Sequence, residues 1–183
     1  MKFSNKFTTI EEIESWHQDQ YQALTNFKSH QVELALSGNR SLNEKFSELT
    51  IDELHSYFDE SLEELDYLVS FNLLSAVEAH IRMDFYSKIK DKPRVNITTR
   101  YRELYKEKGD MVSLEEDLLR ILKEELPDHK SSFSDYIGAL KFRHWIAHGR
   151  YWVPKFGRNY NTASILPITV ATMEAVSELG NAG

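Results

Sequence analysis

The stretch TIDELHSYFDESLEELDYLVSFNLLSAVEAHIRMDFYSKI, residues 50 to 89, decides the fold class of this protein. Thr50 and Glu53 have the spacing of a capping box, which marks the start of a helix. Beyond them, apolar residues recur at helical intervals: Leu54, Tyr57, Phe58, Leu62, Leu65, Leu68 and Val69. The pattern runs on to Pro93, which cannot extend a helix interior. Because such a length is unusual for one helix, we expect a break near Ser70 to Asn72.

Helical signals also fill the segments on both sides. Apolar residues keep helical spacing from Ile10 to Ala35, and Gly38 stops the pattern. Residues 94–99, RVNITT, are the only segment with extended character, and they lead into a short helix that Gly109 closes.

The C-terminal half repeats the same organisation. Ser113 and Glu116 form a second capping box, for a helix that stops at Pro127. We expect Ser131 or Ser132 to cap the next helix, whose core face would comprise Phe133, Tyr136, Ile137, Leu140 and Ala147.

A last helix, with Pro167 at or near its first turn, completes the chain. No repeat or linker interrupts the sequence. We therefore predict an all-α protein, a single domain of residues 1–183 built as a bundle of about five to seven antiparallel helices.

Composition limits the functions that this chain can have. Its 183 residues are 41% hydrophobic and 28% charged, which is typical of an ordinary globular domain. Cysteine is absent, which excludes disulfides, thiolate metal sites and a cysteine nucleophile. The sequence contains no stretch like a signal peptide or a membrane span. We expect a cytoplasmic protein without a membrane partner or a cofactor.

Charge is segregated along the chain, whose formal net charge is −7. Between Tyr136 and Met173 there is no acidic residue, whereas five cations occur: Lys141, Arg143, Arg150, Lys155 and Arg158. A second basic stretch, residues 88–108, also carries +5, so the remaining chain carries −17. Charge runs are most often solvated helix faces, and we interpret residues 88–108 in this way. The first block interleaves its cations with aromatic residues and could present a local site to a phosphate backbone.

The first block contains LKFRHWIAHGRYW, residues 140 to 152. Arginine grips a phosphate with a planar fork of donors, and histidine exchanges a proton near neutral pH. Arg143 and His148 together suit phosphodiester chemistry. A neutral imidazole can take the proton of a ribose 2′-hydroxyl while a guanidinium stabilises charge on the phosphate. No metal is required.

The segment RHWIAH, Arg143 to His148, resembles the R-x4-6-H motif of the HEPN superfamily, in which a polar residue follows the arginine. The resemblance implies an up-and-down helical bundle, a homodimer that pairs the two motif helices, and metal-independent cleavage of RNA to a 2′,3′-cyclic phosphate. It implies that Arg143 and His148 are the catalytic pair and that His144 is the accessory polar residue. A role in toxin–antitoxin systems or phage defence, with a neutralising protein partner, is the corresponding expectation.

One position departs from a HEPN subgroup. In HEPN toxins paired with a nucleotidyltransferase antitoxin, a tyrosine that accepts the modification lies two residues after the histidine. Here that residue is Arg150, and the tyrosine is Tyr151. Pairing with such an antitoxin is not expected.

Other residues are candidates for supporting roles. Glu78 could orient His148 or balance Arg143, or it could form a structural ion pair with Arg82 or Arg143. Trp145 is expected to pack in the core or at a dimer interface. The candidate RNA-binding residues are Lys141, Arg150, Tyr151, Lys155 and Arg158.

Two alternatives stay open. His144 and His148 have the i, i+4 spacing of two metal ligands on a helix, and a metal-dependent hydrolase would need a third ligand such as Glu78 or Asp84. The other alternative is a HEPN-like module that binds RNA or a protein without catalysis.

Overall fold

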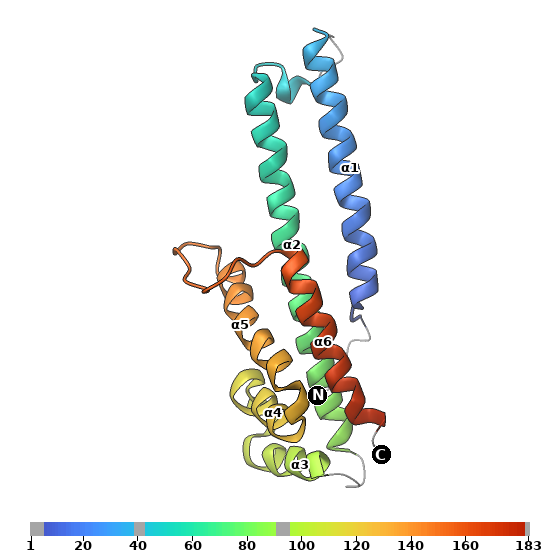
Figure 1. Ribbon diagram of the computed structural model, residues 1–183, viewed down its shortest axis with the longest axis vertical. Helices are drawn as coiled ribbons and strands as arrows, with labels where there is room; N and C mark the ends of the chain where they lie inside the picture. Colours follow the sequence, from blue (N-terminus) through green and yellow to red (C-terminus); the bar gives the residue numbers. More distant parts are fainter. Residues whose placement is uncertain (1–5, 39–42, 91–95, 182–183) are drawn as a thin grey trace. The chain divides into compact units, whose positions relative to one another are not determined.

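The computed structural model describes residues 6–38, 43–90 and 96–181 (Figure 1). These ranges contain no β-strand and six α-helices: α1 (Ile10–Leu36), α2 (Ile51–Lys88), α3 (Asn96–Lys108), α4 (Arg120–Glu125), α5 (Lys130–Ala147) and α6 (Thr162–Asn181). Short helical turns join them: η1 (Glu44–Phe46), η2 (Gly109–Met111), η3 (Leu114–Leu119) and η4 (Pro127–His129). The prediction of an all-α bundle of about five to seven helices is confirmed. Within the described ranges, none of these helices combines the length and hydropathy that crossing a bilayer requires.

The chain divides into two compact units. The hairpin unit comprises Glu11–Val69, and the motif unit comprises Met1–Ile10 with Ser70–Gly183. Helix α2 contributes residues to both units because the division falls between Val69 and Ser70. The interpretation of the chain as a single domain stays a prediction.

The hairpin unit pairs α1 with the first part of α2, and the two lie side by side (Figure 1). Its tip is closed by an aromatic cluster around Phe46, whose ring lies 5.5 Å from that of Phe58 and 6.0 Å from that of Phe27. The predicted capping box of α2 is present: the Thr50 N–H donates to the Glu53 carboxylate at 2.8 Å, and the Glu53 N–H donates to the Thr50 hydroxyl at 3.2 Å.

Helix α2 is continuous, so the expected break at Ser70 to Asn72 is wrong. The helix contains neither glycine nor proline. Ser70 is fully buried, and its hydroxyl lies 3.4 Å from that of Thr162 on α6. The buried face continues beyond it through Leu73, Leu74, Val77, Ile81 and Phe85. Packing along this face stabilises a single long helix. The length of the helical pattern in the sequence had suggested two helices.

The motif unit packs α5 against α6, with α4 against α5 and α3. Phe133, Tyr136, Ala139 and Phe142 form the buried face of α5. The Tyr136 hydroxyl donates to the Leu74 carbonyl of α2 at 2.8 Å. These contacts fix the position of α5 and therefore of the motif that it carries.

Three local expectations for this unit are wrong. Asn96 to Thr99 form the first turn of α3 and are not extended, because Ile97 and Thr98 are buried there; Arg94 and Val95 lie outside the described residues. Helix α5 begins at Lys130 without a side-chain cap, because it follows directly from η4. Pro167 lies inside α6, whose first turn is instead capped by Asn161: its side chain accepts the Ser164 N–H at 2.9 Å.

Candidate functional site

The motif lies at the C-terminal end of α5. Arg143 is in the last turns of the helix, whereas His148 is the residue at which the helix ends, and its N–H donates to the His144 carbonyl at 3.1 Å. Gly149 and Arg150 then adopt left-handed backbone conformations, with φ of 74° and 57°. The sequence interpretation treated His148 as a helical residue, and this detail is wrong. The His148 side chain is exposed.

Arg143 is held against α2 by three contacts. Its Nη1 lies 2.7 Å from Oε2 of Glu78, and its Nε donates to the Ser75 hydroxyl at 3.1 Å. The guanidinium carbon lies 5.5 Å from the ring centroid of Phe71. The side chain is still 31% exposed, and Nη2 makes no ion pair or hydrogen bond with the described residues. One guanidinium nitrogen is therefore available to a ligand, while the other two orient the group.

Glu78 bridges two arginines. Besides Arg143, it accepts a hydrogen bond from Nε of Arg82 at 2.8 Å, and Arg82 also donates to the Val112 carbonyl at 3.3 Å. Of the roles considered for Glu78, the structure shows the ion pairs with Arg82 and Arg143. Its contacts with described residues do not include His148. Glu78 therefore positions Arg143.

The two motif histidines lie together. The ring centroids of His144 and His148 are 4.2 Å apart, and the His144 ring lies 5.9 Å from that of Trp152. Among the described residues, no group of three His, Cys, Asp or Glu side chains could hold a metal ion. The proposed third ligands are engaged elsewhere, Glu78 with the arginines and Asp84 with Lys88. The donor set therefore does not support the metal-dependent alternative.

A cleft of about 550 Å³ opens beside the motif. It is bordered by α5, by the start of η3, by Glu78 of α2 and by the loop that follows α5. Its lining residues are Glu78, Ser113, Leu114, Glu115, Leu140, Lys141, Arg143, His144, Ala147, Trp152, Lys155 and Phe156. His148 is absent from this lining but contacts His144, which belongs to it. The cleft thus places Arg143 and His144 beside a space that a small ligand or a nucleotide could enter, and His148 lies next to His144.

An aromatic cluster holds the loop that follows α5 against that helix. The Phe142 ring lies within 5.9 Å of those of Trp145, Phe156 and Tyr160. The Trp145 indole N–H also donates to the Trp152 carbonyl at 2.8 Å. Trp145 therefore packs within its own chain. Gly138 is required beneath this cluster, because a Cβ there would lie 2.9 Å from the Tyr160 hydroxyl.

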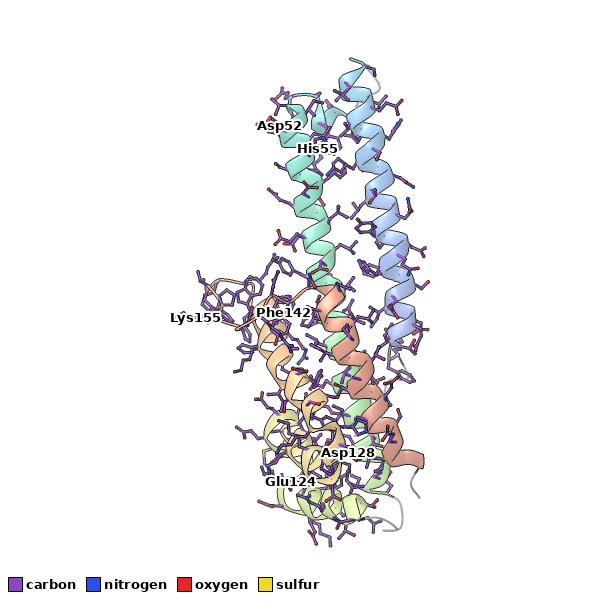
Figure 2. All side chains as sticks on the ribbon, viewed as in Figure 1. Asp52, His55, Glu124, Asp128, Phe142 and Lys155 are labelled. Atoms are coloured by element: carbon purple, nitrogen blue, oxygen red, sulfur yellow. The ribbon has the colours of Figure 1, made fainter. Side chains whose placement is uncertain are left out.

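The five candidate RNA-binding residues differ in their surroundings. Lys141 and Lys155 are exposed and line the cleft, and Figure 2 shows Lys155 on the loop beside α5. Tyr151 is 82% exposed. Arg150 is half-buried at the left-handed turn. Arg158 pairs with Asp135 at 3.1 Å, so its charge is already balanced.

In the second basic stretch, residues 88–108, three of the described cations form ion pairs. Lys88 pairs with Asp84, Arg100 with Glu124 and Glu125, and Lys108 with the buried Asp117. The charges of these cations are therefore balanced within the chain, and the interpretation of the whole stretch as a solvated helix face stays a prediction.

Sequence reasoning missed Ser75 and Glu115. The sequence did contain a signal for Ser75: it lies three residues before Glu78, and this spacing places the two residues on the same side of α2. Glu115 had none: it reaches the cleft only because η3 packs against α5.

Comparison with known proteins adds no family: no family model matches the chain, and searches of curated proteins and of solved structures found no match.

Proposed function

We propose that the protein is a HEPN-type endoribonuclease that cleaves RNA without a metal and leaves a 2′,3′-cyclic phosphate. The observation that carries this proposal is the arrangement of Arg143. Its Nε and Nη1 are fixed by Ser75 and Glu78 on the border of a cleft, while Nη2 remains available to a phosphate oxygen. The exposed His144 and His148 lie at the same end of α5.

The proposed reaction uses these groups as follows. The His148 imidazole accepts the proton of a ribose 2′-hydroxyl while the 2′-oxygen bonds to the adjacent phosphorus. The bond from phosphorus to the 5′-oxygen of the next nucleotide breaks, and that oxygen leaves with a proton from an imidazolium or from water. Arg143 stabilises the negative charge on the phosphate oxygens, and its fixed orientation avoids reorganisation during the reaction. His144 is the accessory polar group.

The proposal includes a homodimer formed through α5, a cytoplasmic location and control by a neutralising protein partner. Lys141 and Lys155 would contact the phosphate backbone, because both are exposed at the cleft. Because the chain is acidic overall, binding would favour a particular RNA loop over polyanions in general.

The test is RNA cleavage in excess EDTA by the wild type, Arg143→Ala and His148→Ala. We expect new cyclic-phosphate ends from the wild type and a loss of rate of about 100-fold or more in each variant. Matched controls are Arg120→Ala and His55→Ala, which remove an exposed arginine and an exposed histidine that do not line the cleft. Arg143→Ala should remain folded because Arg82 still neutralises Glu78. Undiminished cleavage by His148→Ala, or a strict requirement for a metal, would contradict the proposal.

A non-catalytic RNA-binding or protein-binding module is the second candidate. It is favoured by the ion pair between Arg143 and Glu78, because this pair gives Arg143 a structural role without any reaction. RNA binding that survives both substitutions, with no cleavage by any form, would support this candidate.

A further inference from the structure

The cleft beside the motif holds charges of both signs without pairing them. Lys141 of α5 and Lys155 of the following loop are exposed, and so is Glu115 of η3. None of these three side chains makes an ion pair or hydrogen bond with any described residue. A ligand that fits them needs negative charge near the lysines and hydrogen-bond donors near the carboxylate.

Glu115 is the carboxylate of the cleft that is free to bind such donors. The other one, Glu78, is held by Arg143 at 2.7 Å and by Arg82 at 2.8 Å. Glu115 lies in the first turn of η3, and that turn is fixed on both sides of it. The Ser113 hydroxyl accepts the Glu116 N–H at 3.2 Å, and the Ser113 N–H donates to the buried Asp117 at 2.9 Å.

The cleft also offers flat apolar surface. Trp152 and Phe156 line it, and Trp152 is half-buried. Aromatic side chains of this kind stack on unpaired bases of single-stranded RNA. The volume of about 550 Å³ is in the range of pockets that hold small ligands.

We propose that this cleft binds a guanine nucleotide of the RNA and that Glu115 reads its base. A carboxylate is an acceptor with two oxygens. The Watson–Crick edge of guanine presents two adjacent donors, N1–H and the 2-amino group, which match those oxygens. Adenine and cytosine each place an acceptor beside their amino group, and uracil has a single N–H between two carbonyls. Only guanine therefore satisfies both oxygens of Glu115.

The remaining groups of the cleft suit the rest of the nucleotide. Trp152 stacks on the base, and Lys141 and Lys155 contact the phosphates. This inference rests on the proposed function, because it names the RNA sequence at the same site. It concerns binding, however, and can be tested without cleavage.

The first experiment measures binding by fluorescence anisotropy with labelled deoxyribonucleotide probes, TTGT and TTAT, which lack the 2′-hydroxyl nucleophile. We expect the wild type to bind TTGT about tenfold more tightly than TTAT. Glu115→Gln should lose this preference, because an amide replaces one acceptor oxygen with a donor. Glu116→Gln is the matched control: it changes an exposed acid of the same turn that does not line the cleft, and the preference should persist. Trp152→Leu should weaken binding of both probes equally.

A parallel experiment measures cleavage of the ribonucleotides UUGU and UUAU and separates this inference from the proposed function. Selective binding of TTGT with no cleavage of either ribonucleotide would refute the nuclease and keep the guanine site. Equal cleavage of both, with equal binding of both probes, would keep the nuclease and overturn the guanine site. No binding of either probe would overturn the guanine site as well.

Discussion

The two units of the molecule share a helical architecture and differ in charge and in packing. Residues 11–69, the hairpin unit, contain 14 acidic and 3 basic residues, a formal charge of −11. The motif unit contains the other 15 acidic and 19 basic residues, a charge of +4. The net charge of −7 is therefore the sum of two units of opposite charge. A charge summed over the whole chain conceals a unit that can attract a polyanion.

The two units also differ in packing, and the motif unit has the more extensive core. Of the largest fully buried side chains, the hairpin unit supplies Leu54 and the aromatic pair Phe46 and Phe58, and the motif unit supplies the rest. Large exposed apolar residues are correspondingly common in the hairpin unit: Trp16, Tyr21, Phe27, Leu36, Leu49 and Leu68. The unit that carries the candidate site is therefore also the one with the more extensive core.

The largest expected effect tests this difference in packing. Phe133→Ala removes a fully buried ring from α5 and should lower the free energy of unfolding by about 3–5 kcal/mol. Phe27→Ala removes a ring that is 41% exposed in the hairpin unit, and its loss should be smaller. Urea unfolding followed by circular dichroism measures both. Equal losses would show that the hairpin core contributes as much as the motif core.

The loss of stability is expected to be intermediate when one stabilising carboxylate is removed from each unit. Burial disfavours the charged form of Asp117, but hydrogen bonds from Lys108 and from the Ser113 N–H outweigh this and lower its pKa. In the hairpin unit, hydrogen bonds from the Thr50 N–H and hydroxyl lower the pKa of the exposed Glu53. At neutral pH, Asp117→Ala should destabilise the protein by about 1–3 kcal/mol, because it leaves the Ser113 N–H unpaired. Glu53→Ala should cost less.

The pH dependence has the same sign for both residues. A carboxyl whose pKa is lowered in the folded state stabilises the protein above its unfolded pKa, and this contribution is lost as pH falls through the folded pKa. Wild type and Asp117→Ala should therefore converge in stability below about pH 4. Unfolding curves between neutral and acidic pH measure this, and a difference that grows on acidification would contradict the assignment.

The smallest effect tests the difference in charge. If the motif unit contacts RNA phosphates, Lys141→Ala should reduce the slope of log Kobs against log salt by about 0.7 for a single strand. Lys45→Ala removes an exposed lysine of the hairpin unit and should leave the slope unchanged. Anisotropy titrations over a range of salt concentrations measure both slopes. An equal decrease in the two variants would show that RNA binding is not confined to the motif unit.

Local sequence signals predicted the helical elements well. The capping box at Thr50 is complete, because its hydrogen bonds join residues three apart and depend on nothing more distant. At Ser113 only half of the predicted box forms: the Glu116 N–H donates to the Ser113 hydroxyl, but the Ser113 N–H donates to Asp117 and not to Glu116. The errors occurred where packing decides the conformation. Helix α2 continues through Ser70 because that residue is buried, and Asn96 to Thr99 are helical because Ile97 and Thr98 are buried.

The candidate site also combines residues that the sequence predicted with contacts that only the tertiary structure reveals. The types of its residues and their spacing identified Arg143, His144 and His148, and the basic block identified Lys141 and Lys155. The ion pair of Arg143 with Glu78 was one of several possibilities, and only tertiary structure selected it. The contribution of Glu115 depends on the packing of η3 against α5, for which the sequence carries no local signal.

The uninterrupted course of α2 has a consequence for amide exchange. In an α-helix each N–H bonds to the carbonyl four residues earlier, so the amide of Phe71 is protected by the carbonyl of Tyr67. Phe71, Ser75 and Glu78 contact Arg143, whereas Tyr67 belongs to the hairpin unit. Fraying of α2 up to Val69 would therefore expose the amides of Phe71, Asn72 and Leu73 to solvent exchange. Deuterium uptake at these amides would report the local stability of α2 around Val69.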